Sequence, residues 1–187
     1  MRVKLRSWGI FVVTFALSVT YISARTVNVP GDYLTIKSAV GASKDGDEVV
    51  VEDGFYFERN IIISKKIKVR AKSLFGAVIY GPIEPGSCIF IVRAETEISG
   101  FILNNSNTGI IQRESPDVAW QAHDLALLNQ EKGISVNDPE KNIGRAILKN
   151  IIVYIRNEEE KPMRLILSTS NWNPQKASEY LNLRWDY

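Results

Sequence analysis

Few side chains in this chain could do chemistry, and their spacing matches no complete catalytic set. His123 is the only histidine and Cys88 the only cysteine in 187 residues. A zinc or copper site, or a hydrolase triad, would therefore depend on one imidazole or one thiol. We expect His123 to lie on the polar surface of a helix and Cys88 to be a small buried hydrophobe. The sequence thus predicts no cofactor and no metal bound by such ligands.

Acidic residues cluster in the turns of the first third of the chain, at Asp45, Asp47, Glu52 and Asp53. Carboxylates from neighbouring loops can hold Ca²⁺ through oxygen ligands. Aspartate is also favoured in turns because its side chain binds nearby backbone amides. We prefer this structural interpretation and keep Ca²⁺ as the alternative.

Aromatic residues are frequent in the second half of the chain. Trp120, Tyr154 and Trp172 are the candidates for sugar binding, because a flat ring with one polar atom matches the face of a pyranose. A cap over the C-terminal end of the fold is the preferred alternative for these rings. Asparagines around residues 104–107 are expected to form a structural ladder at a bend.

The first 24 residues have the layout of a secretory signal peptide. A basic start is followed by an apolar run from Trp8 to about Val19 and by the small residue Ala24, the expected cleavage point. Without its three basic residues, 20 of the 23 Lys and Arg remain against 21 Asp and Glu. This balance gives no electrostatic support for nucleic-acid binding. We expect a secreted, periplasmic or cell-surface protein with no integral membrane segment after cleavage.

Residues 33–43 are expected to form a short amphipathic helix after the turn at Pro30-Gly31-Asp32. From residue 48 onward, short β-branched segments alternate with turn formers. Apolar segments begin near residues 67, 89, 110 and 134, and a second series begins at 78 and 98. A repeat of this length built from strands predicts a parallel β-helix.

The segment from Val29 to Glu58 resembles the N-terminal region of right-handed parallel β-helix proteins of the pectin lyase-like superfamily. The matching residues are Val29, Pro30, Asp32, Tyr33, Thr35, Ile36, Ala39, Val40, Gly46, Asp47, Val49, Val51, Gly54, Tyr56 and Glu58. The resemblance covers residues 26–113 and implies that the helix caps the N-terminal end of the coil. It says much less about residues 114–187.

Lyases of this superfamily pair an acidic Ca²⁺ site with an Arg or Lys base. Arg93 and Arg113 are about one repeat apart and, with Glu95, are the catalytic candidates that the resemblance implies. The chain lacks the acidic cluster at the same register and also lacks the superfamily's pectate lyase and pectin methylesterase motifs. Catalysis is therefore the less favoured interpretation.

We predict a signal peptide over residues 1–24 and one all-β domain over residues 25–187, a right-handed parallel β-helix. Within this domain, the cap helix is followed by regular turns over 47–113. Irregular turns and a C-terminal cap are expected over 114–187. Ser115-Pro116-Asp117 and the stripe of Val118, Ala122, Leu125 and Leu128 predict a helical insertion over 116–131.

The favoured function is non-catalytic binding of a polysaccharide or cell-envelope glycan. The alternatives are a lyase or hydrolase of acidic polysaccharide, and a truncated relic of a longer β-helix protein.

Overall fold

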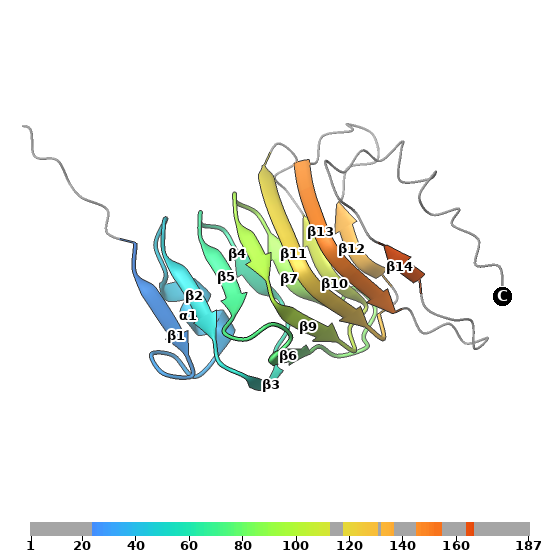
Figure 1. Ribbon diagram of the computed structural model, residues 1–187, viewed down its shortest axis with the longest axis horizontal. Coiled ribbons are helices and arrows are strands. Elements are labelled where there is room, and N and C mark those ends of the chain that lie inside the picture. The colour runs from blue at the N-terminus through green and yellow to red at the C-terminus, as the bar shows by residue number, and fades with distance from the viewer. Residues whose placement is uncertain (1–23, 113–117, 131, 137–144, 155–163, 167–187) are drawn as a thin grey trace, which may run out of the picture.

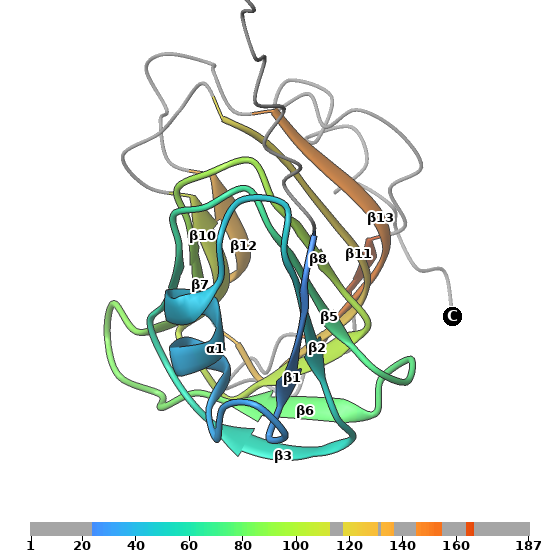
Figure 2. The ribbon, with the colours of Figure 1, turned by 90° about the vertical axis from the view of Figure 1, so that its left-hand side faces the viewer.

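The computed structural model describes residues 24–112, 118–130, 132–136, 145–154 and 164–166, which form a coil of about five turns (Figures 1 and 2). Nearly all its strands run parallel, and each pairs with the strand one turn away. The chain is an all-β parallel β-helix, as predicted.

Three rows of strands form the walls of the coil (Figure 2). The first row contains β1 (Thr26–Val29), β2 (Glu48–Val51), β5 (Lys68–Ala71) and β8 (Glu97–Ser99). The second contains β3 (Gly54–Phe57), β6 (Ala77–Tyr80) and β9 (Phe101–Asn104). The third contains β4 (Ile61–Ile63), β7 (Cys88–Val92), β10 (Thr108–Gln112) and β12 (Lys132–Val136). The long strands β11 (Ala119–Leu128) and β13 (Arg145–Tyr154) follow, and β14 (Arg164–Ile166) pairs antiparallel with β13.

The core fills the coil because alternate side chains of every row point inward. In the first row, Val49 pairs with Val69, and Val69 pairs with Ile98; all three are buried. Phe90 and Phe101 bring the second and third rows together, with ring centroids 5.9 Å apart. Like side chains thus stack from turn to turn, so the β-branched residues of the sequence form continuous apolar columns.

The strand series predicted from sequence spacing combined different rows. Ile67 precedes β5 of the first row, whereas the segments at 89, 110 and 134 belong to β7, β10 and β12 of the third. Val78 pairs with Ile102 rather than with Ile98. The repeat was recognisable although these assignments were wrong, because register partners in most neighbouring strands are 20 to 24 residues apart, as for Glu48 and Lys68 or Thr108 and Lys132. The steps from β4 to β7 and from β5 to β8 are longer, at 29 residues.

The helix α1 (Ile36–Ala42) lies over the N-terminal end of the coil (Figure 2). Its buried residues Ile36, Ala39 and Val40 join the core. The helix begins later than predicted because Thr35 is its N-cap, with Oγ1 accepting a hydrogen bond from the amide of Ser38 at 3.1 Å. The predicted cap helix is therefore confirmed.

The predicted helical insertion over 116–131 is wrong where the structure describes it, because residues 119–128 form the strand β11. Trp120 and Ala122 point into the core, Asp124 bends the chain at φ 54°, and Leu125 and Leu127 then point inward. The bend at Asp124 changes which side chains of the strand point inward, from even-numbered residues before it to odd-numbered residues after it. The three-residue step from Ala122 to Leu125 therefore imitates a helical stripe.

Left-handed residues stack at the bends between strands. Asp124 and Asn150 have φ of 54° and 51°, and the Nδ2 of Asn150 donates to the Oδ1 of Asp124 at 2.8 Å. At a second bend, the Nδ2 of Asn129 donates to the Oδ1 of Asn104 at 3.0 Å. The expected ladder of polar side chains at the bends is present at these positions.

Cys88 is buried, as expected. Within the described ranges, no helix has the length and apolar character needed to cross a bilayer. The predicted signal peptide, apart from its last residue, and nearly all of the predicted C-terminal cap lie outside the described residues.

Candidate functional site

The outward face of the first row carries alternating charges that pair between successive turns. Lys68 Nζ lies 3.3 Å from Glu97 Oε2, and Arg70 Nε donates to Glu48 Oε1 at 2.9 Å. The Nε2 of Gln121 donates to the same Glu97 oxygen at 2.9 Å. Glu97 meets Lys68 and Gln121 because stacked turns place these residues opposite each other in register. Arg70 reaches Glu48 diagonally, since its register partner in β2 is Val50.

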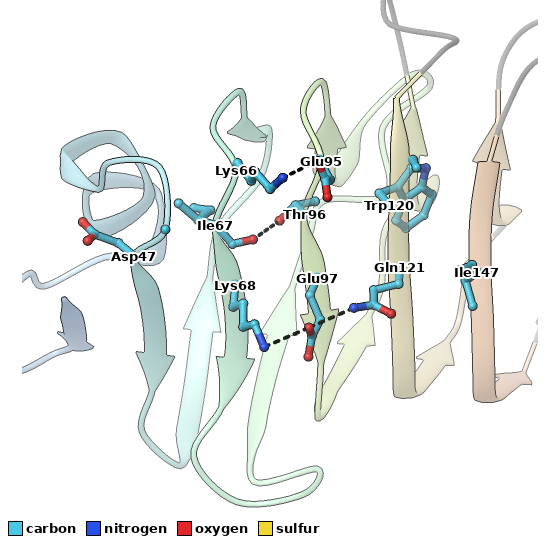
Figure 3. Close-up of a pocket in the computed structure, with 12 residues that line it drawn as sticks. Asp47, Lys66, Ile67, Lys68, Glu95, Thr96, Glu97, Trp120, Gln121 and Ile147 are labelled. Carbon is cyan, nitrogen blue, oxygen red and sulfur yellow. Dashed lines mark hydrogen bonds and ion pairs between the residues drawn. The ribbon is translucent and has the colours of Figure 1, made fainter. Parts of the chain in front are cut away.

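A pocket of ≈ 390 Å³ opens at the start of this face (Figure 3). Its charged lining residues are Asp47, Lys66, Lys68, Glu95 and Glu97, and Thr96 and Ile67 lie between the lysines and the two glutamates. Lys66 Nζ lies 2.7 Å from Glu95 Oε2. The pocket therefore presents ion pairs whose members come from two successive turns.

The structure places two of the sequence candidates at this pocket. Glu95 is exposed beside Lys66, whereas Trp120 is only 2% exposed and its indole N–H donates to Gln112 Oε1 at 2.9 Å. Trp120 is thus a core residue that presents no ring face to a sugar. Arg93 is half-buried just after β7.

The remaining candidates fall outside what the structure describes. Arg113 and Trp172 lie in undescribed segments, and so does the side chain of Tyr154, whose backbone ends β13. Their predicted roles stay predictions.

His123 lies between two carboxylates rather than on a helix surface, which corrects the prediction. Its Nδ1 is 2.7 Å from Asp124 Oδ2 and its Nε2 is 3.2 Å from Glu97 Oε1. On the predicted helix, the side chains of the sequential residues His123 and Asp124 would point apart. The left-handed conformation of Asp124 in β11 instead brings its side chain to the imidazole.

The three groups shift one another's proton affinity. Burial opposes the charged form of His123, but hydrogen bonds to Asp124 and Glu97 outweigh it and raise the imidazole pKa above 6.5. Burial likewise raises the pKa of Glu97, yet hydrogen bonds from His123 and Lys68 lower it overall. Hydrogen bonds from His123 and Asn150 lower the pKa of Asp124. The cluster favours an imidazolium between two carboxylates.

This arrangement suits structure better than acid–base catalysis. A base must offer a lone pair to the substrate, but both ring nitrogens of His123 face carboxylates. The carboxylates of Glu95 and Glu97 likewise face lysines of the preceding turn. Proton abstraction at this face would require one of these ion pairs to open.

Two of the four acidic residues weighed as Ca²⁺ ligands bind backbone amides in the turns, and a third, Glu52, pairs with Lys72. Asp47 accepts from the amides of Arg25 and Lys44 at 3.0 and 2.8 Å, and Asp45 accepts from the amide of Lys66 at 2.9 Å. Across the described ranges, no three His, Cys, Asp or Glu residues come together as a metal site.

A row of aromatic rings covers the outward face at the N-terminal end of the second row. Phe55 and Phe57 of β3 are 70% and 80% exposed. The Phe57 ring stacks on Tyr80 of β6 with centroids 5.3 Å apart and 21° between the planes, and Phe55 lies 6.1 Å from the same tyrosine. We call Phe55, Phe57 and Tyr80 the aromatic platform.

The aromatic platform was not predicted because the strands were sought in β-branched segments, and Phe55-Tyr56-Phe57 contains no β-branched residue. The alternation in Phe55-Tyr56-Phe57 was the available signal. In a strand, Tyr56 points to one face and the two phenylalanines to the other, and the partly buried Tyr56 packs against the core.

No protein-family model and no curated protein matches the chain. Solved structures similar to it include AlyGC, an alginate lyase of the PL6 family, at 15% identity and a TM-score of 0.50 over 70% of this chain and 24% of that enzyme. An arginine-to-alanine variant of AlyGC aligns at 17% identity and a TM-score of 0.47, over 70% of this chain and 20% of the variant. The chain thus spans about a quarter of the length of AlyGC, at 24%.

At this identity the similarity concerns the fold alone. Together with the described strands, it confirms the predicted fold: the chain is a parallel β-helix protein.

Proposed function

We propose that this chain is an exported, non-catalytic glycan-binding protein, and the observation that carries the proposal is the aromatic platform. Large apolar side chains so exposed on a sheet face mark a contact surface. Flat rings match the C–H face of a pyranose, and the hydroxyl of Tyr80 adds a polar group at the edge. The ligand would be a polysaccharide or cell-envelope glycan.

The rigidity of β3 and β6 supports this proposal. Phe55 pairs with Val78 and Phe57 with Tyr80 in a parallel ladder, so the backbone under all three rings is fixed. Tyr80 also restricts the ring of Phe57 by stacking on it. A ligand would then lose little affinity to the ordering of protein side chains.

Affinity electrophoresis against a panel of soluble polysaccharides tests the proposal. We expect at least one polymer to retard the wild type and Phe57→Ala to abolish most of this retardation. Leu74→Ala removes a comparably exposed apolar side chain elsewhere and should leave retardation unchanged. Absence of retardation by every polymer, or equal loss in both variants, would overturn the proposal and favour the relic interpretation.

A lyase acting on acidic polysaccharide is the second candidate. The pocket lined by Lys66, Lys68 and Glu95 favours it, and AlyGC, which shares the fold, is an alginate lyase. Incubation with alginate and polygalacturonate near neutral pH, with Ca²⁺, would give absorbance from unsaturated uronides if this candidate holds. Loss of that product in Arg113→Ala and Glu95→Gln would support catalysis. If the wild-type protein releases no unsaturated product, the lyase candidate is ruled out.

Export is proposed from the N-terminal sequence. When the full chain is expressed in a host with a secretory pathway, we expect a mature protein that begins after Ala24. Retention of the intact N-terminus in the cytoplasm would contradict export.

A further inference from the structure

We propose that the aromatic platform selects uncharged glycans and disfavours polyuronates such as alginate. This inference rests on the proposed glycan-binding function and specifies its ligand class. It follows from the position of the platform in the coil and from the charges around it.

The platform lies at an end of its row. The second row ends at β3 (Figure 1), so the stacking of Phe57 on Tyr80 occupies only the side of the ring that faces β6. With 80% of Phe57 exposed, the opposite side of the ring is open to solvent. A pyranose could therefore lie against Phe57 without displacing another side chain.

Four carboxylates belong to the segments next to β3 and β6, the strands that carry the platform. Glu52 and Asp53 directly precede β3, and Glu58 directly follows it. Glu84 comes from the loop after β6 and pairs with Arg59 at 2.6 Å. Acidic groups therefore flank the strand at both ends.

The basic groups near the platform are fewer than the four carboxylates, and two of them neutralise Glu52 and Glu84. Lys72 pairs with Glu52 at 2.8 Å, and Arg59 pairs with Glu84. Lys37 is exposed on α1, where its backbone amide donates to Glu58. The acidic groups thus outnumber the basic ones around β3.

The side chain of Tyr56 points to the face opposite the two phenylalanines, yet its hydroxyl responds to the carboxylates on either side of β3. Burial raises the pKa of its hydroxyl, and the charges of Glu52, Asp53 and Glu58 raise it further. The same charges would repel a carboxylate carried by a ligand at this strand. A polyuronate brings one carboxylate with every sugar, whereas a neutral glycan brings none.

The pocket of Lys66 and Lys68 differs in this respect, because its lysines could exchange their glutamate partners for a ligand carboxylate. Binding of acidic polymers, if it occurred, would therefore belong to that face and would not depend on Phe57. This separates the two surfaces experimentally.

Affinity electrophoresis at low salt tests the inference with two sets of polymers: mixed-linkage β-glucan, galactomannan and xylan as neutral probes, and alginate and polygalacturonate as acidic probes. We expect a neutral probe to bind the wild type at least about tenfold more tightly than either acidic probe. Phe57→Ala should weaken neutral binding by about tenfold. Circular dichroism confirms that each variant is folded.

A charge reversal provides the matched test of the cause. Asp53→Lys should give binding to an acidic probe, and adding Phe57→Ala to it should remove that binding. Two results would overturn the charge selection while leaving glycan binding intact. The first is a wild type that binds an acidic probe through Phe57 as tightly as a neutral probe. The second is an Asp53→Lys variant that gains no binding to an acidic probe. Absence of binding to all five polymers would instead overturn the proposed function itself.

Discussion

The carboxylate of Glu58 accepts a hydrogen bond from the backbone amide of Ile36, with Oε1 2.7 Å from the nitrogen. Its second oxygen accepts from the amide of Lys37 at 2.8 Å. Glu58 directly follows β3, and these amides begin α1. One side chain therefore fastens the cap helix to the coil, satisfies two amides that lack helical partners and places a negative charge at the positive end of the helix.

Glu58→Gln should destabilise the protein by about 1 kcal/mol, because an amide side chain replaces one of the two accepting oxygens and removes the charge. Urea unfolding measures the change. Glu84→Gln, which removes only an exposed ion pair, should cost less than about 1 kcal/mol. Equal stability of Glu58→Gln and wild type would show that the cap helix is held by its apolar face alone.

Phenylalanines inside and outside the coil should respond differently to truncation. Phe101 is fully buried against Phe90, so Phe101→Ala should cost about 3–5 kcal/mol. Phe55→Ala, at an exposed position, should change stability by about 0.5 kcal/mol or less. Similar losses in the two variants, measured by denaturant unfolding, would contradict the assignment of the two faces.

The His123 cluster should make stability depend on pH. The pKa of His123 in the folded state is raised above its unfolded-state value of about 6.5. The imidazolium therefore contributes its full stabilisation below pH 6.5, and this stabilisation is lost as the pH rises through the folded-state pKa. The folded pKa values of Glu97 and Asp124 are lowered from about 4.5 and 3.8. Their contributions to stability are therefore complete above those unfolded-state pKa values and are lost as the pH falls through the folded-state values. The cluster should therefore stabilise the fold most between about pH 4.5 and 6.5.

The difference in unfolding free energy between wild type and His123→Gln measures this contribution. We expect a difference of about 1 kcal/mol or less near pH 5.5, because the groups are partly exposed, and a smaller one at pH 9. A difference that grows with rising pH would show that His123 is held in its neutral form.

The bend at Asn129 should tolerate glycine better than alanine. Asn129 has φ 52° and donates to Asn104. Asn129→Ala loses this hydrogen bond and strains the left-handed backbone, at a cost of about 1–2 kcal/mol. Asn129→Gly loses only the hydrogen bond, since glycine adopts this conformation freely. If alanine is as stable as glycine here, the bend is not left-handed.

Chelation should leave the fold intact. Because Asp45 and Asp47 bind backbone amides, we expect the same thermal midpoint with EDTA and with millimolar Ca²⁺. A midpoint that rises with Ca²⁺ would indicate a cation site.

The cap and the first turns could be predicted because their sequence carries local signals with structural causes. Thr35 caps α1, Asp47 binds two turn amides and Glu58 reaches back to the helix. Each of these residues belongs to the motif that resembles the β-helix superfamily.

The second half was harder to predict because of one backbone bend. The left-handed Asp124 shifts the inward alternation of β11 and makes a strand look like a helix. The pairing of His123 with Glu97, 26 residues earlier, depends on that strand and on the register between turns. Residue spacing alone gives neither.

The most direct test of the central claim is an NMR titration of the aromatic side chains with oligosaccharides from the polymer that binds best. The account predicts saturable shifts for the ring resonances of Phe55, Phe57 and Tyr80, with the Thr96 methyl in the pocket unmoved. Shifts at Thr96 without change at Phe57 would contradict it.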